Sequence, residues 1–245
     1  MRQGELDMPV ALLAGGLATR LRPLTERVPK VLLEVAGKPF LHHQLTYLRS
    51  QGIRDVVLCV GHLGEMIRDE FGDGSEYGIR LRYSFDGPRL LGTGGAIRHA
   101  LPMLGSSFFV LYGDSYLMVD YASVAAAFYR SGKSALMTLF ENNGQWDTSN
   151  VWFENGTIKI YDKSVLVPEM RHIDYGLSAF HASVFEGFPQ GSVLDLADIQ
   201  RALASQGEMA GYVASHRFYE IGSRAGLAEL DSLLLAQQSL TAVSR

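Results

Sequence analysis

The chain has 245 residues, 47% of them hydrophobic and 20% charged, with a formal net charge of −4, a composition that is typical of globular proteins and excludes a disordered or fibrous chain. This mildly acidic balance argues against a nucleic-acid partner, because binding to the phosphate backbone usually needs a basic surface. No apolar run reaches the roughly 20 residues of a membrane span, and Met1–Pro9 lacks the apolar core of a signal peptide, so we expect a cytoplasmic protein with no membrane partner.

The first half of the chain alternates short apolar runs with helical patterns. Pro9–Leu13 predicts a buried strand, and Phe40–Gln51, which follows a proline and stops at Gly52, predicts a helix. Further strands are expected at Asp55–Val60, Ile79–Phe85, Phe108–Tyr112 and Ala135–Phe140, and further helices at Gly64–Phe71, Ala96–Leu101 and Asp120–Ser131. This alternation predicts an α/β fold of βαβ units with a mostly parallel sheet between two layers of helices.

The pattern changes after about residue 140. Asn155-Gly156 lies between two strand-like runs and is a strong hairpin signal. The remaining elements are expected at Val151–Phe153, Thr157–Tyr161, Ile173–Phe180, Leu194–Ser205, Phe218–Ile221 and Gly226–Gln238. The last of these is an amphipathic helix, and its stripe of Leu227, Leu230 and Leu234 is expected to pack on the sheet. No linker composition marks a domain boundary, so we expect one domain whose second half adds an antiparallel lobe.

Glycines and arginines follow the first strand, at the end where parallel sheets bind ligands. Gly15-Gly16 lets the backbone amides approach a phosphate, and Arg20 and Arg22 offer guanidinium groups to its oxygens. The segment is neither a Walker loop nor a Gly-x-Gly-x-x-Gly dinucleotide fingerprint, which argues against a nicotinamide oxidoreductase. From the glycines alone, a simple strand-to-loop turn with two exposed arginines remains an equal alternative. On the same reasoning a site is expected just after Leu13, Val60, Phe85 and Tyr112.

The continuation of this segment is more specific. Leu13-Ala14-Gly15-Gly16-Leu17-Ala18-Thr19-Arg20-Leu21 is followed at fixed distance by Pro29-Lys30 and by Gly37-Lys38-Pro39. Together these segments resemble the signature of the nucleoside-triphosphate sugar-1-phosphate nucleotidyltransferases. Leu91–Ala96 is similar to the second glycine-rich segment of that family, and Gly113-Asp114 is similar to its metal-binding motif.

The resemblance implies a fold, a reaction and a division of the chain. The fold is a Rossmann-like (GT-A type) mixed, mostly parallel sheet flanked by helices, with a small antiparallel substrate lobe. The reaction is Mg²⁺-dependent transfer of a nucleotidyl group from a nucleoside triphosphate to a sugar 1-phosphate, with release of pyrophosphate. A single domain of residues 1–245 would contain a nucleotide-binding part (about 8–140), a sugar-phosphate-binding lobe (about 141–223) and a closing helix (224–245). The loop departs from the family at Ala18, where glycine is usual, and the methyl group is expected to narrow the loop or to require a negative φ.

The family also implies the site residues. The expected catalytic residues are Arg20, Lys30 and Asp114. The expected nucleotide-binding residues are Leu13, Ala14, Gly15, Gly16, Thr19, Gly92, Thr93 and Gly94. The expected sugar-phosphate-binding residues are Lys163, Asp174, Gly176 and Asn150, with Trp146 and Ser149 as further candidates in the same loop. Asp114 and Glu220 are expected to hold Mg²⁺, although Glu220 stands where the family has aspartate and binds directly or through water.

Other chemistries have little support in the sequence. The seven histidines show no zinc spacing, and no Gly-x-Ser-x-Gly elbow suggests a serine hydrolase. Cys59 lies in an apolar strand, where a buried structural thiol is expected.

The segments Gly37–Leu41, Leu91–Ile97 and Asp174–Ser178 look closest to the D-glycero-D-manno-heptose 1-phosphate guanylyltransferases, which implies GTP and a heptose 1-phosphate as substrates. The alternatives are a uridylyltransferase or cytidylyltransferase that acts on another sugar phosphate or on phosphocholine, and a non-catalytic nucleotide-sensing relative. The sequence leaves open whether the protein is a homo-oligomer.

Overall fold

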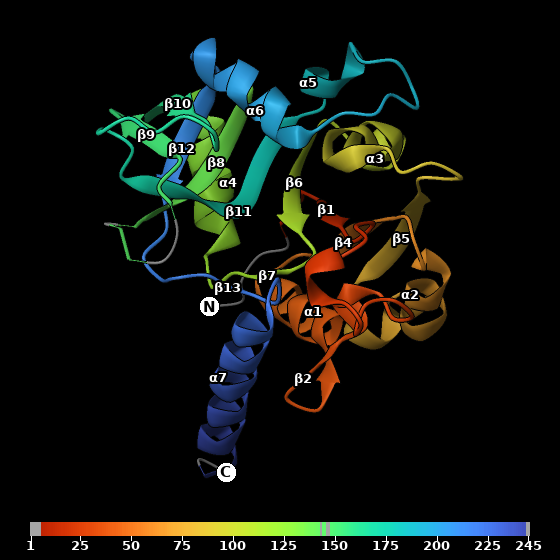
Figure 1. The fold of residues 1–245 in the computed structure, drawn as a ribbon. Helices are drawn as coiled ribbons and strands as arrows, with labels where there is room; N and C mark the ends of the chain where they lie inside the picture. The colour runs from red at the N-terminus through yellow and green to blue at the C-terminus, as the bar shows by residue number, and fades with distance from the viewer. Residues whose placement is uncertain (1–5, 143, 146–147, 244–245) are drawn as a thin grey trace.

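The structure is a computed structural model that describes residues 6–142, 144–145 and 148–243. Strands and helices alternate through its first half, as the sequence predicts (Figure 1). The elements of this half are β1 (Val10–Leu13), β2 (Glu34–Val35), β3 (Lys38–Pro39), α1 (Phe40–Ser50), β4 (Asp55–Val60), α2 (Gly64–Phe71), β5 (Arg80–Phe85), α3 (Gly92–Ala100), β6 (Ser107–Tyr112), β7 (Ser115–Tyr116) and α4 (Tyr121–Ser131).

The second half is richer in strands. Its elements are β8 (Ala135–Glu141), β9 (Val151–Glu154), β10 (Thr157–Tyr161), β11 (His172–His181), α5 (Ser183–Glu186), α6 (Leu196–Ser205), β12 (Met209–Val213), β13 (Tyr219–Glu220) and α7 (Arg224–Val243). Asn155 and Gly156 have φ values of 52° and 76° and connect antiparallel β9 and β10, which confirms the predicted hairpin. No helix in the described part of the chain is long and apolar enough to cross a membrane.

Nine strands form one mixed sheet in the order β5-β4-β1-β6-β11-β8-β12-β10-β9. β5, β4, β1 and β6 are parallel, and their register places Leu13 beside both Cys59 and Tyr112. β11 is antiparallel to β6 and to β8, so the strands of the second half extend the same sheet. The predicted α/β fold with a mixed sheet is therefore confirmed, and the carboxyl ends of the parallel strands meet at one edge.

Helices cover both faces of this sheet, so the apolar residues on both sides of its strands are buried. Val10 and Leu12 of β1 pack with apolar residues of α1, α2 and α4, whereas Ala11 packs with those of α3, α5 and α6. This alternation follows from the two-residue period of a strand. Figure 1 shows α3, α5 and α6 on the opposite side of the sheet from α1 and α2.

Two helix starts differ from the prediction, one because of a partner far away in the sequence and one because of a local N-cap. α3 begins at Gly92 rather than at Ala96, because the carbonyl oxygen of Leu194 accepts hydrogen bonds from the amides of Gly94 and Gly95 (2.9 and 3.2 Å). These bonds satisfy amides at a helix start whose glycines have little helical propensity. The helix predicted at Leu194–Ser205 begins at Leu196, since Asp195 is its N-cap.

The sequence did not predict the short strands β2, β3 and β7, nor β12 of the nine-stranded sheet. β12 is the longest of these. Its centre is Gly211, which breaks the alternation that usually marks a strand. A Cβ atom at Gly211 would lie only 2.4 Å from the Phe153 ring, so the glycine is required by close packing.

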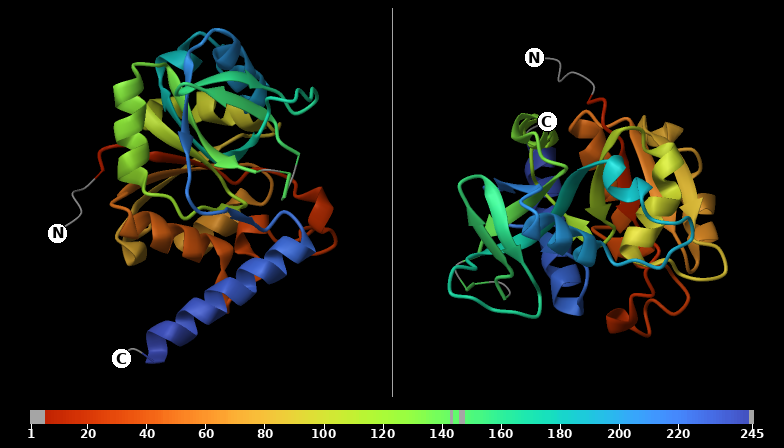
Figure 2. Two further views of the ribbon diagram at one scale, coloured as in Figure 1. Left: turned by 90° about the vertical axis from the view of Figure 1, so that its left-hand side faces the viewer. Right: turned by 90° about the horizontal axis from the view of Figure 1, so that it is seen from above.

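The expectation that the closing helix packs on the sheet is wrong: α7 packs beside the small β2–β3 hairpin instead. Leu230 and Leu234 are buried in a cluster with Val35 and other residues around that hairpin. The Ala36 amide, in the hairpin turn, donates a 2.7 Å hydrogen bond to Oδ1 of Asp231. Figure 2 shows that the helix then extends away from the body of the molecule.

Candidate active site

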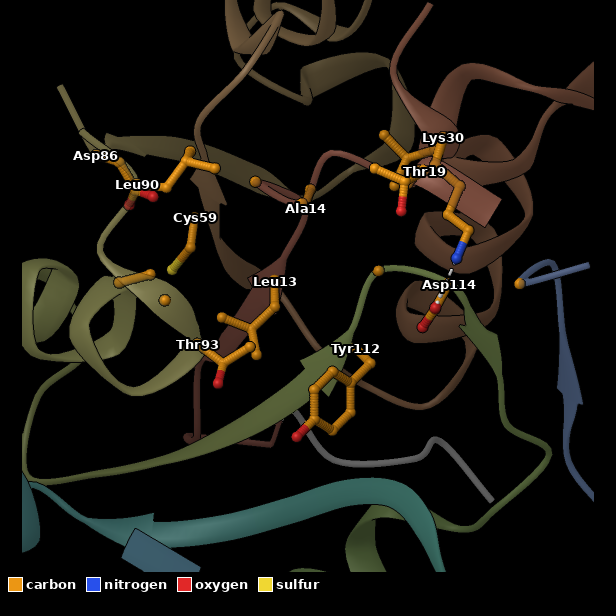
Figure 3. Close-up of a pocket in the computed structure, with 18 of the residues that line it drawn as sticks. Leu13, Ala14, Thr19, Lys30, Cys59, Asp86, Leu90, Thr93, Tyr112 and Asp114 are labelled. Carbon is orange, nitrogen blue, oxygen red and sulfur yellow. Dashed lines mark hydrogen bonds and ion pairs between the residues drawn. The ribbon is translucent and has the colours of Figure 1, made fainter. Parts of the chain in front are cut away.

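A cavity of about 380 Å³ opens at the carboxyl ends of β1, β4, β5 and β6 (Figure 3). The sequence predicts a site at this edge of the sheet, because a ligand there can meet several strand ends at once. The lining residues are Leu13, Ala14, Gly15, Gly16, Ala18, Thr19, Arg20, Lys30, Val31, Cys59, Asp86, Leu90, Gly92, Thr93, Ala96, Tyr112, Gly113, Asp114 and Gly222.

The glycine loop after β1 forms one wall of the cavity. A Cβ atom at Gly15 would lie 3.0 Å from the Gly61 amide nitrogen, so the loop approaches the end of β4 more closely than a larger residue allows. Gly16, in contrast, faces open space. Close backbone approach of this kind brings amide groups within reach of a bound anion.

Ala18 has φ +46° and ψ +43°, so the expectation that alanine requires a negative φ here is wrong. Two hydrogen bonds to the Ala18 carbonyl oxygen stabilise this left-handed conformation. One comes from the Thr25 hydroxyl (2.8 Å) and the other from the Leu21 amide (3.1 Å). The next residues form the short 3-10 turn η1 (Thr19–Leu21), which carries Arg20 at the cavity.

Lys30 and Asp114 form an ion pair in the cavity. Lys30 begins the 3-10 turn η2 (Lys30–Leu32), and Asp114 follows the end of β6. The Nζ atom of Lys30 lies 2.7 Å from Oδ2 of Asp114, and the two side chains are 15% and 28% exposed. Among the residues that the structure describes, Oδ1 of Asp114 receives only a long hydrogen bond of 3.4 Å from the Ser115 hydroxyl. The structure therefore brings two of the expected catalytic residues into direct contact.

Glu220 and Arg20 approach the same place from other segments. Glu220 pairs with Ser115 between β13 and β7, and the Ile221 amide donates a 2.9 Å hydrogen bond to the Asp114 carbonyl oxygen. A Cβ atom at Gly222 would lie 3.4 Å from Oε1 of Glu220 and 3.7 Å from Nη2 of Arg20. The backbone of Glu220 therefore lies beside Asp114, while its carboxylate and the Arg20 guanidinium both lie near Gly222. Mg²⁺ is commonly bound by one or two carboxylates together with phosphate oxygens, and these two acidic residues are of the type that can supply them.

The second glycine-rich segment lines the cavity and also forms hydrogen bonds with the residues before α6. Gly92 and Thr93 line it, whereas Gly94 does not, and the Gly94 amide is bonded to Leu194. The Thr93 hydroxyl donates to Oδ1 of Asp195 (3.1 Å) and accepts from the Leu196 amide (2.8 Å). The segment thus joins the start of α3 to the start of α6.

The expected sugar-phosphate residues cluster beside the end of β6. Asp174 accepts hydrogen bonds from the Gly176 amide (3.0 Å) and the Tyr161 hydroxyl (3.2 Å), and its own amide donates to Oδ1 of Asn150 (3.1 Å). Burial raises the pKa of Asp174, against the opposing effects of the Lys163 ammonium and these two donors. Lys163 is exposed, with Nζ 5.8 Å from the centre of the Tyr161 ring.

A packing contact ties this cluster to the cavity. A Cβ atom at Gly176 would lie 3.2 Å from Oγ of Ser115, the residue after Asp114. Ser149 accepts a hydrogen bond from Asn142. Trp146 lies outside the described residues.

Several lining residues were not predicted as site residues, among them Cys59, Asp86, Leu90 and Tyr112. Asp86 and Tyr112 lie at or just after strand ends, which is the signal that could have identified them. Burial raises the pKa of Asp86, whose Oδ2 accepts the Leu91 amide at 3.1 Å. Burial also raises the pKa of Cys59 to about 12, as expected for a structural thiol.

This chain is similar to proteins of known function over most of its length. The profile of the Nucleotidyl transferase family matches residues 10–150. An N-acetylmuramate alpha-1-phosphate uridylyltransferase from Neisseria meningitidis is 32% identical over 92% of this chain and 98% of its own length. A D-glycero-alpha-D-manno-heptose 1-phosphate guanylyltransferase from Campylobacter jejuni is 38% identical over 46% of this chain and 50% of its own length.

Solved structures share the fold. One described as a glucose-1-phosphate thymidylyltransferase from Bacillus anthracis has a TM-score of 0.80 at 22% identity, covering 93% of this chain and 95% of its own. HddC from Yersinia pseudotuberculosis has a TM-score of 0.75 at 22% identity, covering 93% of this chain and 99% of its own.

Proposed function

Since this chain belongs to the nucleotidyl transferase family and is a sugar-1-phosphate nucleotidyltransferase, we propose that it transfers GMP from GTP to a heptose 1-phosphate. The segments Leu91–Ile97 and Asp174–Ser178, which resemble the heptose guanylyltransferases, support this choice. The guanylyltransferase from Campylobacter jejuni also supports it, because its identity of 38% is higher than the 32% of the uridylyltransferase from Neisseria meningitidis, although it extends over only about half of the chain.

The reaction needs positioning more than it needs a base. An anionic phosphate oxygen of the sugar 1-phosphate attacks the α-phosphorus of the triphosphate, a new P–O bond forms, and the bond to the β-phosphate breaks to release pyrophosphate. Because the nucleophile is already ionised, no side chain has to remove a proton. The protein has to hold two polyanions together and to stabilise charge as it moves between oxygens.

The Lys30–Asp114 pair is the observation that carries the proposed mechanism. Both residues line the cavity together with the glycine loop, and Ser115, which follows Asp114, lies close to Gly176 of the Asp174 cluster. The loop and this cluster are the proposed sites of the two substrates. Arg20 and the loop amides would hold the β- and γ-phosphates, and Lys30 would bridge the α-phosphate and the incoming phosphate. Each of these groups is a donor that suits phosphate oxygens.

The remaining roles fall to the Asp174 cluster and to two acidic residues. Lys163 would hold the phosphate of the sugar, with Asn150, Asp174 and Gly176 around its ring. Asp114 and Glu220 would hold Mg²⁺, which when bound neutralises negative charge at the α-phosphate. We also propose that residues 1–245 act as one domain, with the nucleotide in the part of about 8–140 and the sugar phosphate in the part of about 141–223.

A second candidate is uridylyl transfer to N-acetylmuramate 1-phosphate. The relative from Neisseria meningitidis favours it, because its similarity includes the sugar-phosphate lobe as well as the nucleotide-binding half. The two candidates share the mechanism above and differ in the base and the sugar.

Pyrophosphate release tests both. Purified protein with Mg²⁺ is given each of four nucleoside triphosphates together with heptose, mannose, glucose or N-acetylmuramate 1-phosphate. We expect release from GTP with a heptose 1-phosphate, loss of release with excess EDTA, and loss in Asp114→Asn. Asp69→Asn, the same change at an exposed position of α2, is the matched control and should leave the rate unchanged. Release from another pair would reassign the substrates, and undiminished release by Asp114→Asn would contradict the proposed metal site.

A further inference from the structure

Gln44 interrupts the apolar face of α1. The other residues that this helix buries are apolar, namely Phe40, Leu41, Leu45 and Leu48. Gln44 lies among them and is only 3% exposed. A buried polar side chain destabilises a fold unless hydrogen bonds satisfy it. Gln44 therefore needs partners in the structure around it.

Both partners of Gln44 flank the proposed metal ligand Asp114. The Nε2 atom of Gln44 donates hydrogen bonds to the carbonyl oxygens of Tyr112 (3.3 Å) and Ser115 (2.9 Å), which lie 68 and 71 residues further along the chain. Tyr112 ends β6 and Ser115 begins β7, so these two carbonyls belong to the two ends of the turn that carries Asp114 (Figure 3). One side-chain amide thus holds both ends of this turn against α1.

The same turn is joined to the second acidic residue, Glu220. β7 pairs with β13, and their register places Ser115 opposite Glu220. The Ile221 amide also donates to the carbonyl oxygen of Asp114. A shift of the turn would therefore move the backbone of both acidic residues.

The surroundings of Gln44 determine how its amide is oriented. A carbonyl oxygen only accepts hydrogen bonds, so the group that faces two carbonyl oxygens is the NH₂ with its two donors. The Oε1 atom of Gln44 then has no hydrogen-bond partner among the described residues. A buried acceptor without a partner is unfavourable, so the two donors are what this position contributes.

α1 is itself held in place, which allows it to fix the turn. Nε2 of His43 donates a 2.7 Å hydrogen bond to the carbonyl oxygen of Val35, and the Tyr47 hydroxyl donates one of 3.2 Å to the carbonyl oxygen of Val119. Apolar residues of the same helix pack in the core with those of β1. Gln44 therefore projects from a well-anchored helix.

We propose that Gln44 is a positioning residue for nucleotidyl transfer, whose amide holds the turn between β6 and β7 so that Asp114 and Glu220 bind the metal ion together. The inference rests on the proposed role of these two acidic residues in binding Mg²⁺. Gln44 itself does not line the cavity, so it acts through them and not on a substrate. Removing a group that orients metal ligands typically costs about 10- to 100-fold in metal affinity or activity.

The Mg²⁺ dependence of the rate separates positioning from a purely structural role. Gln44→Met keeps the length of the side chain and removes both donors, and Gln44→Leu does so with a branched side chain in case the first variant does not fold. Pyrophosphate release is measured with whichever triphosphate and sugar 1-phosphate the wild type uses best. We expect the Mg²⁺ concentration for half-maximal rate to rise about tenfold or more, with a lower kcat at saturating Mg²⁺. A smaller folded fraction would lower kcat alone, because it does not change the Mg²⁺ affinity of the molecules that remain folded.

Nucleotide binding gives a second readout that needs no turnover. Isothermal titration calorimetry measures the Kd of the same triphosphate without a sugar phosphate, once with EDTA and once with excess Mg²⁺. We expect Mg²⁺ to strengthen binding to the wild type, and to strengthen binding to Gln44→Met severalfold less. The Kd in EDTA should be the same for both proteins, since Arg20 and the glycine loop are unchanged.

Gln200→Met is the matched control. Gln200 is also buried, its Nε2 donates to the Ser178 hydroxyl (3.1 Å), and its Oε1 likewise has no partner in the described part of the chain. This variant should lose stability in thermal unfolding as Gln44→Met does, but keep the wild-type Mg²⁺ requirement.

The outcomes distinguish this inference from the proposed metal site. An unchanged Mg²⁺ requirement in the folded Gln44 variants would overturn the inference even if kcat falls, while loss of release in Asp114→Asn would still support the metal site. An equal rise in Gln200→Met would also overturn the inference, because the loss of any buried glutamine would then suffice. Undiminished release by Asp114→Asn would refute the metal site and the inference together.

Discussion

A Lys30→Met variant keeps the apolar part of the side chain at the start of η2. It loses the ammonium group that lies 2.7 Å from Oδ2 of Asp114. We propose that this ammonium contacts the α-phosphate and the incoming phosphate during the reaction. The variant should therefore bind the nucleotide through Arg20 and the glycine loop and still transfer it slowly. The expected change is in kcat more than in the KM for the nucleotide.

The size of the effect follows from the position of the charge. Two unit charges about 4 Å apart interact by about 4 kcal/mol at an effective dielectric constant of 20, which corresponds to about a thousandfold in rate. The side chain of Lys30 is 15% exposed, so solvent screens part of this interaction. We therefore expect a loss of about 10² to 10³ in kcat. The loss of stability should stay below about 2 kcal/mol, because both partners are partly hydrated and the desolvation of a pair offsets much of its attraction.

Steady-state pyrophosphate release with both substrates varied separates kcat from KM, and thermal unfolding measures stability. Lys159→Met, which makes the same change at an exposed position of β10, is the matched control and should behave as the wild type. The reasoning is refuted if Lys30→Met keeps more than about a tenth of the wild-type kcat. It is also refuted if the loss of activity is matched by a comparable loss of folded protein at the assay temperature.

Three further predictions concern stability. Ala18→Gly should be equally or more stable in thermal unfolding, by up to about 1 kcal/mol, because the left-handed backbone at φ +46° is unfavourable for an L-residue; a less stable variant would contradict this account of the loop. Asp120→Ala should lose about 1 kcal/mol without a change in kcat, since the Asp120 side chain accepts the Ala122 amide as the N-cap of α4; an unchanged melting temperature would argue against that cap. Burial raises the pKa of the Asp174 carboxyl above its usual value of 3.8. Ionisation of this carboxyl is therefore less favourable in the folded protein than in the unfolded chain, and the folded state loses stability as the pH rises above about 4. Asp174→Asn should therefore be more stable than the wild type at pH 7 in urea unfolding, with a difference that shrinks toward about pH 4, and a difference independent of pH would disprove the cause.

The edge of the sheet that holds the cavity was predictable because it follows from local patterns. Apolar runs that end at Leu13 and Tyr112 indicate parallel strands, and the polar residues that follow such strands share one edge. The contact between Lys30 and Asp114 is different, since 84 residues separate them and only the folded chain brings their side chains together. The resemblance to a family suggested that both act at one site, but it contained no geometry.

The parts that the sequence could not predict depend on partners far along the chain. The early start of α3 needs the Leu194 carbonyl, and β12 needs the space beside Phe153 that Gly211 leaves. The left-handed conformation of Ala18 needs the Thr25 hydroxyl, a partner that is only seven residues away but that no propensity scale or periodicity includes. Propensity and periodicity describe near neighbours only, so contacts of this kind override them without a local signal.

The bond from the Ala36 amide to Asp231 has a consequence for how the protein is made. It joins residues 195 positions apart, and the hairpin turn that it fixes follows Lys30 closely in the chain. A ribosome completes every strand of the nine-stranded sheet before α7 emerges, so the sheet can assemble on the nascent chain. The segment that carries Lys30 receives its last support only when translation has reached α7. A product released early would therefore lack this support for the segment that carries Lys30.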